Sequence, residues 1–254
     1  MNHLIRQNRL ALDAKCASML HPFLPVLTDY LDGKYSKLTI MSIRCLNGFL
    51  NFSLPNLPNS IHQIMTKLFV LMSTYSNSTS SSQNSENSIG DNFELLMVCY
   101  KLTASIIKNC SYFRLNGEQL TMLLHYAERN LYDNSKQPSA FNLIKSILSR
   151  KIQSDELTDI LSKIMKMSIQ SESSNVRLQS RQIILQYMLE FSFGEKKLSK
   201  LLEFYVIQLD YEYENGRESA LEMLATIFNT FPQVQPIFLL NIFFTVNKHF
   251  LLNL

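Results

Sequence analysis

Residues 219–228 read SALEMLATIF, a segment in which apolar side chains follow the first serine at the third, fifth, sixth, ninth and tenth places. Similar segments are MSIRCLNGFL from residue 41, VCYKLTASII from residue 98 and SAFNLIKSIL from residue 139. A weaker copy, SRQIILQYML from residue 180, has Gln182 at the third place. Because residues three and four apart share one face of an α-helix, each copy predicts a helix with one apolar face.

The copies recur at spacings of 57, 41, 41 and 39 residues. The long first spacing contains STYSNSTSSSQNSENS at residues 73–88, which are 16 residues with 8 serines, and without them the spacing returns to 41. A period near 40 is typical of HEAT and armadillo repeats, in which each helix pair buries its apolar face by stacking on the next pair. The sequence therefore predicts an all-α fold, a HEAT/armadillo-like α-solenoid of about five antiparallel helix pairs.

The domain organisation follows from the same periodicity. We expect residues 1–254 to form a single α-solenoid segment, because a stacked array has no internal domain boundary. The Ser/Asn-rich insertion, taken as residues 73–90, has too few apolar side chains to offset its ordering entropy. It is predicted to be a disordered loop between two helices.

Apolar residues at intervals of three and four predict helices along the whole chain. The ranges are 2–20, 23–31, 38–51, 60–73, 92–110, 117–132, 138–150, 155–169, 175–190, 196–209, 216–230 and 234–250. From residue 23 onward they pair in order as hairpins, with each copy of the repeated segment on the second helix. Side-chain pairs of the capping-box type support three starts: Ser60 with Gln63, Asp91 with Glu94, and Asn116 with Gln119.

The apolar members of the repeated segments define the predicted core. They are Leu143, Ile144, Ile147, Leu185, Met188, Leu221, Leu224 and Phe228. The last segment, from residue 234, is apolar nearly all round. Since natural solenoids end in caps with a polar outer face, this end predicts that the chain is a piece of a longer array.

Composition excludes several classes of function. The net charge of +3 does not by itself indicate a nucleic-acid-binding chain, and no apolar run is long enough to span a membrane. Phosphate-binding, hydrolase and metalloprotease motifs are absent from the sequence, and its 5 histidines lack metal-ligand spacing. The 4 cysteines have no C-x-x-C spacing and are predicted to be buried thiols. We therefore predict no catalytic residues, no metal site, no cofactor and no small-molecule substrate.

One group of basic residues is a candidate contact surface for RNA or a protein partner. Its members are Lys196, Lys197, Lys200 and Arg181, with Arg177, Arg150 and Lys151 nearby in the predicted hairpins. A discontinuous basic strip of this kind could follow a phosphate backbone, although a solvated charged face is the simpler interpretation. Arg177 and Arg217 precede the repeated segment at similar places, where a structural role is predicted, bonding carbonyls or acids of the neighbouring repeat.

Several stretches resemble a known family. They are YDNSKQPSAFNLIKSILSRK at residues 132–151, VRLQSRQIILQYMLEF at 176–191, LEFYVIQLDYEYENGRESALEMLATIFNTFPQ at 202–233, and CYKLTASIIKNC at 99–110. Their order and spacing are similar to a region near the C-terminal end of the very large HEAT-repeat proteins of the small-subunit processome, the U3 small-nucleolar-RNP-associated, down-regulated-in-metastasis family. The most specific part is Y-E-x-E-x-G-R-x-S-x-L-E-M-L, at residues 211–224.

The resemblance implies a function that periodicity alone does not. Members of that family act as non-catalytic scaffolds in the nucleus and nucleolus, and they support pre-rRNA processing and 18S rRNA maturation. It implies pre-ribosomal proteins as partners, together with pre-rRNA or U3 small nucleolar RNA, and no membrane. Two alternatives remain. Another HEAT scaffold, such as a nuclear-transport receptor or a regulatory subunit, should lack the pattern at residues 211–224, and an enzyme would need a constellation of polar residues.

Overall fold

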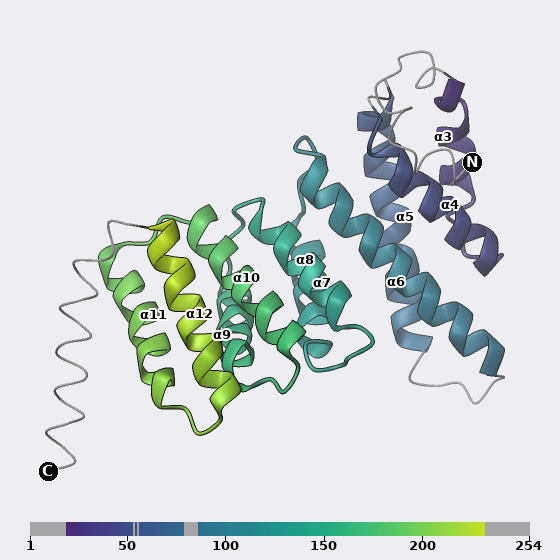
Figure 1. Cartoon of the computed structure of the whole chain (residues 1–254). Helices are drawn as coiled ribbons and strands as arrows, with labels where there is room; N and C mark the ends of the chain where they lie inside the picture. Colours follow the sequence, from purple (N-terminus) through teal and green to yellow (C-terminus); the bar gives the residue numbers. More distant parts are fainter. Residues whose placement is uncertain (1–18, 53, 55, 79–85, 232–254) are drawn as a thin grey trace, which may run out of the picture. The chain divides into compact units, whose positions relative to one another are not determined.

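The computed structural model describes residues 19–52, 54, 56–78 and 86–231 (Figure 1). Within these residues the regular elements are helices and none is a strand, which confirms the all-α prediction. The helix predicted at 234–250, and all but the end of the one predicted at 2–20, lie outside the described residues. The chain divides into two compact units, Met1–Arg150 and Lys151–Leu254, which we describe separately.

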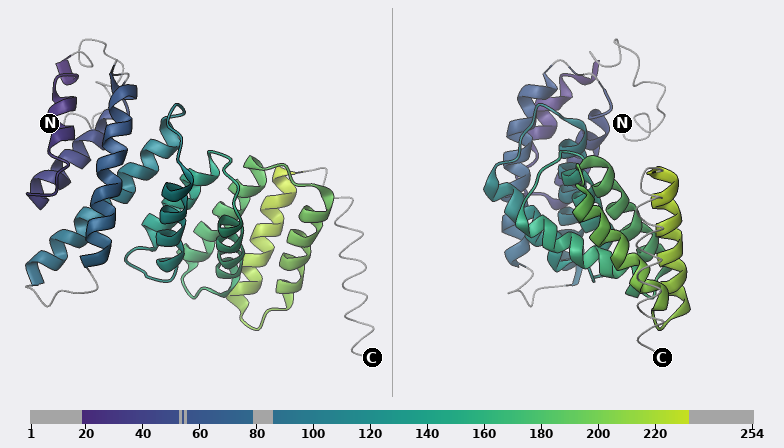
Figure 2. Two further views of the ribbon diagram at one scale, coloured as in Figure 1. Left: turned by 180° about the vertical axis from the view of Figure 1, so that it is seen from behind. Right: turned by 90° about the vertical axis from the view of Figure 1, so that its left-hand side faces the viewer.

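The described residues of the first unit form three helix pairs. They are α3 (Phe23–Asp29) with α4 (Ser36–Phe49), α5 (Leu57–Ser78) with α6 (Glu86–Asn109), and α7 (Gly117–Arg129) with α8 (Gln137–Leu148). The second helices form a continuous layer, because α4 packs on α6 and α6 packs on α8 (Figure 2). The first three copies of the repeated segment therefore lie next to one another, as stacking of repeats requires.

In the second unit, residues 151–231 form two further pairs. They are α9 (Asp155–Gln170) with α10 (Ser174–Glu190), and α11 (Glu195–Ile207) with α12 (Glu214–Thr230), the latter two joined through the short 3-10 helix η1 (Gln208–Asp210). Helix α12, yellow in Figure 1, packs on α9, α10 and α11. All five copies of the repeated segment thus lie on second helices, and each unit has the paired-helix stacking of an α-solenoid. That residues 1–254 form one continuous array stays a prediction.

Local chemistry explains some of the helix starts. Asn116 and Gln119 form the predicted capping box at α7, with the Gln119 amide donating to Asn116 Oδ1 at 2.8 Å and the Asn116 amide to Gln119 Oε1 at 3.1 Å. The predicted caps at Ser60 and Asp91 are wrong, because α5 and α6 start earlier and both residues lie inside helices.

The serine-rich stretch contributes more structure than expected. Helix α5 continues through residue 78 and α6 begins at residue 86, so only residues 79–85 of the predicted loop lie outside the described residues. Tyr75, within the stretch, donates a hydrogen bond from its hydroxyl to the Gly33 carbonyl at 3.1 Å. The predicted loop bounds of 73–90 are therefore wrong at both ends, because α5 and α6 extend into them.

The core agrees with the repeated pattern with one exception. Leu143, Ile144, Ile147, Met188 and Leu224 are buried, and Leu185 and Phe228 are half-buried. Leu221 is 56% exposed, so its assignment to the core is wrong. It lies on the same exposed face of α12 as Glu218, Glu222 and Ala225, which follow the three- and four-residue spacing of one helix face.

Candidate functional site

The three lysines of the basic strip lie where α11 begins. Lys196, Lys197 and Lys200 are all exposed and occupy the first two turns of the helix. None of them takes part in an ion pair among the described residues. These ammonium groups are therefore available to an anionic partner.

Arg181 does not belong to this strip. Its side chain is only 13% exposed and forms an ion pair with Glu222, and its guanidinium also donates a hydrogen bond to the Ser219 hydroxyl. Burial lowers the pKa of Arg181, while the neighbouring Glu222 carboxylate opposes that change. The Arg181 donors are thus directed to α12, and a contact of Arg181 with RNA or a partner stays a prediction.

Arg181 is part of a polar cluster that joins α9, α10, α11 and α12. Ser219 on α12 donates a hydrogen bond to the Ser168 carbonyl on α9 at 2.5 Å. The Ser168 hydroxyl lies 3.1 Å from the hydroxyl of Tyr205 on α11. Burial raises the pKa of Tyr205 to about 12, so this phenol stays protonated and can donate. The cluster fixes the register of α9 to α12 through bonds that are costly to leave unmade.

Arg177 and Arg217, near the starts of α10 and α12, make equivalent contacts. Arg177 Nη1 donates to the carbonyl oxygens of Ser171 and Glu172 at 2.8 and 2.9 Å. Arg217 Nη1 makes the same two bonds, to the carbonyls six and five residues earlier, at 2.9 and 3.0 Å. The predicted structural role is confirmed. The predicted location of the acceptors in the neighbouring repeat is wrong, since they lie in the arginine's own hairpin.

The remaining arginine and lysine near the strip are also engaged. Arg150 donates from Nη2 to the carbonyl oxygens of Ser111 and Phe113 at 2.9 and 2.8 Å, within the first unit. Lys151 Nζ lies 4.0 Å from a carboxylate oxygen of Glu190, within the second unit. Of the basic group predicted from the sequence, the structure therefore leaves the three lysines of α11 as the free cations.

The family-specific segment at residues 211–224 is occupied with packing. A Cβ added to Gly216 would lie 2.4 Å from Cδ1 of Tyr211, so only glycine allows the tyrosine ring to lie against the helix. Arg217 and Ser219 make the bonds described above, and Leu224 is buried. Gly216, Arg217, Ser219 and Leu224 of the pattern therefore take part in packing within the second unit, while its members Glu212, Glu214, Leu221 and Glu222 are exposed.

A pocket of about 440 Å³ lies on the outer side of the arginine cluster, between the starts of α10 and α12. Asn175, Asn215, Glu218 and Glu222 contribute to its wall. Both carboxylates are exposed, and one of them is paired with Arg181. Arg177 and Arg181 also line it, but both guanidinium groups already donate within the second unit, so the pocket does not extend the basic strip toward a phosphate backbone.

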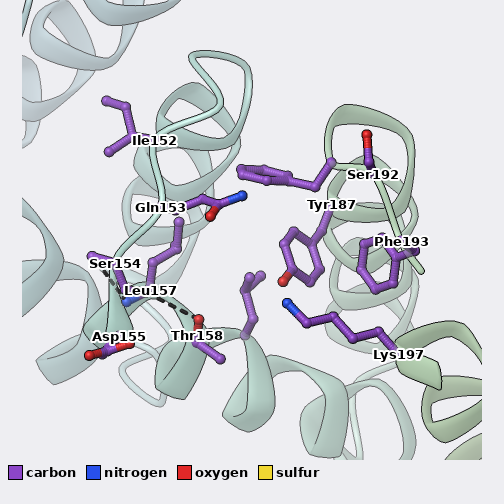
Figure 3. Close-up of a pocket in the computed structure, with 12 residues that line it drawn as sticks. Ile152, Gln153, Ser154, Asp155, Leu157, Thr158, Tyr187, Ser192, Phe193 and Lys197 are labelled. Carbon is purple, nitrogen blue, oxygen red and sulfur yellow. Dashed lines mark hydrogen bonds between the residues drawn. The ribbon is translucent and has the colours of Figure 1, made fainter. Parts of the chain in front are cut away.

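A second pocket, of about 350 Å³, lies beside the lysines of α11 (Figure 3). Its wall comes from the start of α9 and from the end of α10, where Tyr187, Phe191 and Phe193 gather. The ring centroid of Tyr187 is 4.9 Å from that of Phe193 and 5.0 Å from that of Phe191, with tilted planes. Lys197 completes the wall, and in Figure 3 its ammonium group and the Tyr187 hydroxyl point toward each other. We call this the aromatic pocket.

Sequence reasoning did not find the aromatic pocket. The available signal is the spacing of Tyr187, Phe191 and Phe193, followed by the lysines. That spacing predicts aromatic side chains near one helix end, but not the segment that faces them. The facing wall comes from residues 152–158, about 30 positions earlier, and only the α9–α10 hairpin brings the two together.

The described residues contain no group of three or more His, Cys, Asp or Glu side chains that could hold a metal ion. Cys45, Cys99 and Cys110 are buried thiols outside any disulfide, as predicted, while Cys16 lies outside the described residues. Burial raises the pKa of Cys99 to about 12. No helix in the described part of the chain is long and apolar enough to cross a membrane.

Comparison with known proteins bears out the resemblance seen in the sequence. The chain is 29% identical over 146 residues to U3 small nucleolar RNA-associated protein 20 of Schizosaccharomyces pombe, a match that covers 58% of the chain and 6% of that protein. It is 26% identical over 210 residues to the protein of the same name in Saccharomyces cerevisiae, with 83% and 8% covered. The chain thus spans less than a tenth of the length of these curated relatives. No family model matches the chain.

Proposed function

We propose that this chain is a non-catalytic scaffold segment of the small-subunit processome, needed for pre-rRNA processing and 18S rRNA maturation in the nucleolus. The observation that carries the proposal is the similarity along 83% of the chain to a U3 small nucleolar RNA-associated protein. In general terms, the proposal assigns the chain a role in ribosome biogenesis. More specifically, it proposes that the chain is a scaffold, that it supports 18S rRNA maturation and that it lies in the nucleolus.

The structural contacts of the residues that carry the family resemblance support the scaffold part of the proposal. In an enzyme family, diagnostic residues gather around a reacting centre, in a pocket with perturbed acids and bases. Here Tyr211, Gly216, Arg217 and Ser219 hold the start of α12 against its neighbours. Residues that preserve the stacking of helices preserve the extended surface on which a solenoid binds its partners.

The proposed partners are pre-ribosomal proteins, pre-rRNA and U3 small nucleolar RNA. Lys196, Lys197 and Lys200 are placed to contact a phosphate backbone, because they cluster at the start of α11, are exposed and form no ion pair among the described residues. Since each phosphate contact releases about one counterion, three contacts should give a measurable dependence on salt.

Sedimentation of the tagged chain from a cell extract tests this proposal. We expect it to migrate with U3-containing small-subunit precursors and to be absent from mature subunits. Migration with a nuclear-transport receptor cargo, or with a phosphatase or kinase complex, would support the alternative HEAT scaffold and overturn the proposal.

A charge-reversal series tests the contact surface within the same experiment. Replacing Lys196, Lys197 and Lys200 with glutamate should release the chain from precursors at lower salt than the wild type. The matched control replaces the exposed residues Lys37, Lys101 and Lys166, which changes the net charge equally. If both triple variants behave alike, the lysines of α11 are not the contact and protein neighbours hold the chain.

A further inference from the structure

The aromatic pocket combines part-exposed aromatic rings with an exposed lysine. Tyr187 and Phe193 are half-buried, so part of each ring faces the open space of the pocket. Lys197 stands at the same space and is exposed. A ring that is only part-covered, next to an unpaired ammonium group, offers a stacking surface and a positive charge within one site.

The rings are arranged to hold a flat group. Tyr187 and Phe193 meet edge to face at 77°, so their planes form two walls of a corner. Tyr187 and Phe191 are tilted by 55°, and Phe191 is buried beneath them. A planar ring that enters the corner can stack on one wall and meet the edge of the other, the two geometries that aromatic pairs prefer.

Polar groups on the opposite wall can bond to the edge of such a ring. The Gln153 carboxamide lines the pocket and is exposed, and Figure 3 shows it directed toward the aromatic side. Thr158 also lines this wall, with its hydroxyl donating to the Ser154 carbonyl at 3.1 Å, which leaves the hydroxyl oxygen as an acceptor. The wall therefore presents both donors and acceptors, as the edge of a nucleobase does.

The charges near the pocket favour an anionic occupant. Lys197 lines it, and Lys196 and Lys200 lie within one turn on α11. Asp155 is the acidic residue of the lining, and it lies in the first turn of α9, where the helix dipole offsets its charge. With three unpaired lysines on one side, a phosphate is better accommodated than a cationic side chain.

We propose that the aromatic pocket binds one nucleotide of single-stranded RNA, with its base stacked on Phe193 and its phosphate at Lys197. Aromatic platforms beside a basic groove are the general means by which proteins bind single strands without reading long sequences. The inference rests on the proposed function for the identity of the nucleic acid, and it adds a defined site that the lysines alone do not provide. An aromatic segment of a protein partner is the competing occupant.

Binding of a labelled oligouridine to the full 254-residue chain tests the pocket directly. Replacing Phe193 with alanine should weaken binding about fivefold to a hundredfold, the range found for loss of one stacked base. It should leave the salt dependence unchanged, because no charge is removed. Replacing Lys197 with glutamate should weaken binding and also flatten the salt dependence.

Matched variants separate a binding effect from a folding effect. Phe193→Tyr keeps an aromatic plane and should bind as the wild type does, whereas Phe193→Leu keeps apolar bulk without a plane and should bind weakly. Leu189→Ala and Lys166→Glu alter exposed residues of α10 and α9 and should change nothing. If Phe193→Ala does not fold, as judged by circular dichroism, the leucine variant decides the result.

Ultraviolet cross-linking of the chain in precursor particles identifies the occupant. A nucleotide attached to the peptide that carries Tyr187 or Phe193 supports the proposal. Wild-type affinity of Phe193→Leu, or cross-links from this peptide to protein alone, overturns it. If the chain still sediments with precursors in that case, the pocket inference fails while the proposed function stands. If the chain binds oligouridine through the pocket but does not sediment with precursors, the pocket inference stands and the proposed function fails.

Discussion

Arg181 on α10 forms an ion pair with Glu222 on α12, 41 residues later in the chain. The arginine side chain is 13% exposed and the glutamate side chain is 63% exposed. The pair therefore has an inner partner, whose loss leaves the cluster incomplete, and an outer partner, which water can replace. Loss of the arginine should therefore cost more stability than loss of the glutamate charge.

Arg181→Met should lower the free energy of unfolding by about 1 to 3 kcal/mol, because it removes a charge-assisted bond to Ser219 together with the ion pair. Glu222→Gln should lower it by less than about 1 kcal/mol, since an exposed partner contributes little. Urea unfolding followed by circular dichroism measures both. Equal losses in the two variants would show that the bond to Ser219 adds nothing.

Gly216→Ala should destabilise the protein by about 1 to 3 kcal/mol, although alanine normally favours a helix over glycine. The added Cβ would lie 2.4 Å from Cδ1 of Tyr211 and 3.2 Å from the Cγ2 atom of Ile169. Gly117→Ala is the matched control, because nothing lies within 4 Å of the added atom at this helix start. The control should be neutral or slightly stabilising.

A double-mutant cycle identifies the cause of the Gly216 effect. With Tyr211→Ala in the background, the ring that meets the new methyl group is absent. The cost of Gly216→Ala should then fall well below its cost in the wild type. An undiminished cost would assign the effect to Ile169 or to the backbone instead.

Leu224→Ala and Leu221→Ala should have different consequences, although both leucines belong to the repeated segment. Leu224 is 4% exposed, so its truncation should cost about 2 to 5 kcal/mol through lost burial and a cavity. Leu221 is 56% exposed, and its truncation should cost less than about 1 kcal/mol. Thermal melting of the two variants measures the difference, and similar melting temperatures would contradict the exposure of Leu221.

Alkaline pH should destabilise the protein through its buried thiol and phenol groups. Burial raises the pKa of Cys99 from 9.0 to about 12 and that of Tyr205 from 10.0 to about 12. Between these values the unfolded chain has lost protons that the folded chain keeps, so unfolding becomes easier as pH rises from about 9 to 12. Below pH 9 the two groups are protonated in both states and have no effect on pH dependence.

The Cys99→Ala variant tests this assignment. Its free energy of unfolding should fall less steeply between pH 9 and 12 than that of the wild type, whatever its stability at neutral pH. Lys166→Met, which alters an exposed side chain, is the control, and its free energy of unfolding should fall between pH 9 and 12 as steeply as that of the wild type. An unchanged slope in Cys99→Ala would show that the thiol titrates alike in the folded and unfolded chains.

The sequence predicts the helices well because their signal is local. Apolar spacing and the box at Asn116 report on neighbouring residues of one helix, and these predictions agree with the structure. The third place of the repeated segment shows that the local pattern does not predict burial equally well in the two units. It is buried at Tyr100 and Phe141 in the first unit, yet exposed at Gln182 and Leu221 in the second. The polarity of Gln182 was the one sign of this difference.

The candidate sites depended on contacts that are distant in the chain. Arg181 could not be separated from the lysines by sequence, because its partner lies in the next hairpin. The aromatic pocket needs the start of α9 opposite the end of α10, and apolar periodicity does not report on the ends of helices. Arg177 and Arg217 were predicted correctly as structural residues from their equivalent places before the repeated segment, but their acceptors lie five and six residues away and not in the neighbouring repeat.

Depletion of this protein from growing cells, followed by measurement of mature rRNAs, tests the central claim most directly. The proposed function predicts a fall in mature 18S rRNA and accumulation of its precursors, while the large-subunit rRNAs stay at their normal levels. Unchanged 18S rRNA, or an equal fall in the rRNAs of both subunits, would contradict a scaffold role in small-subunit assembly.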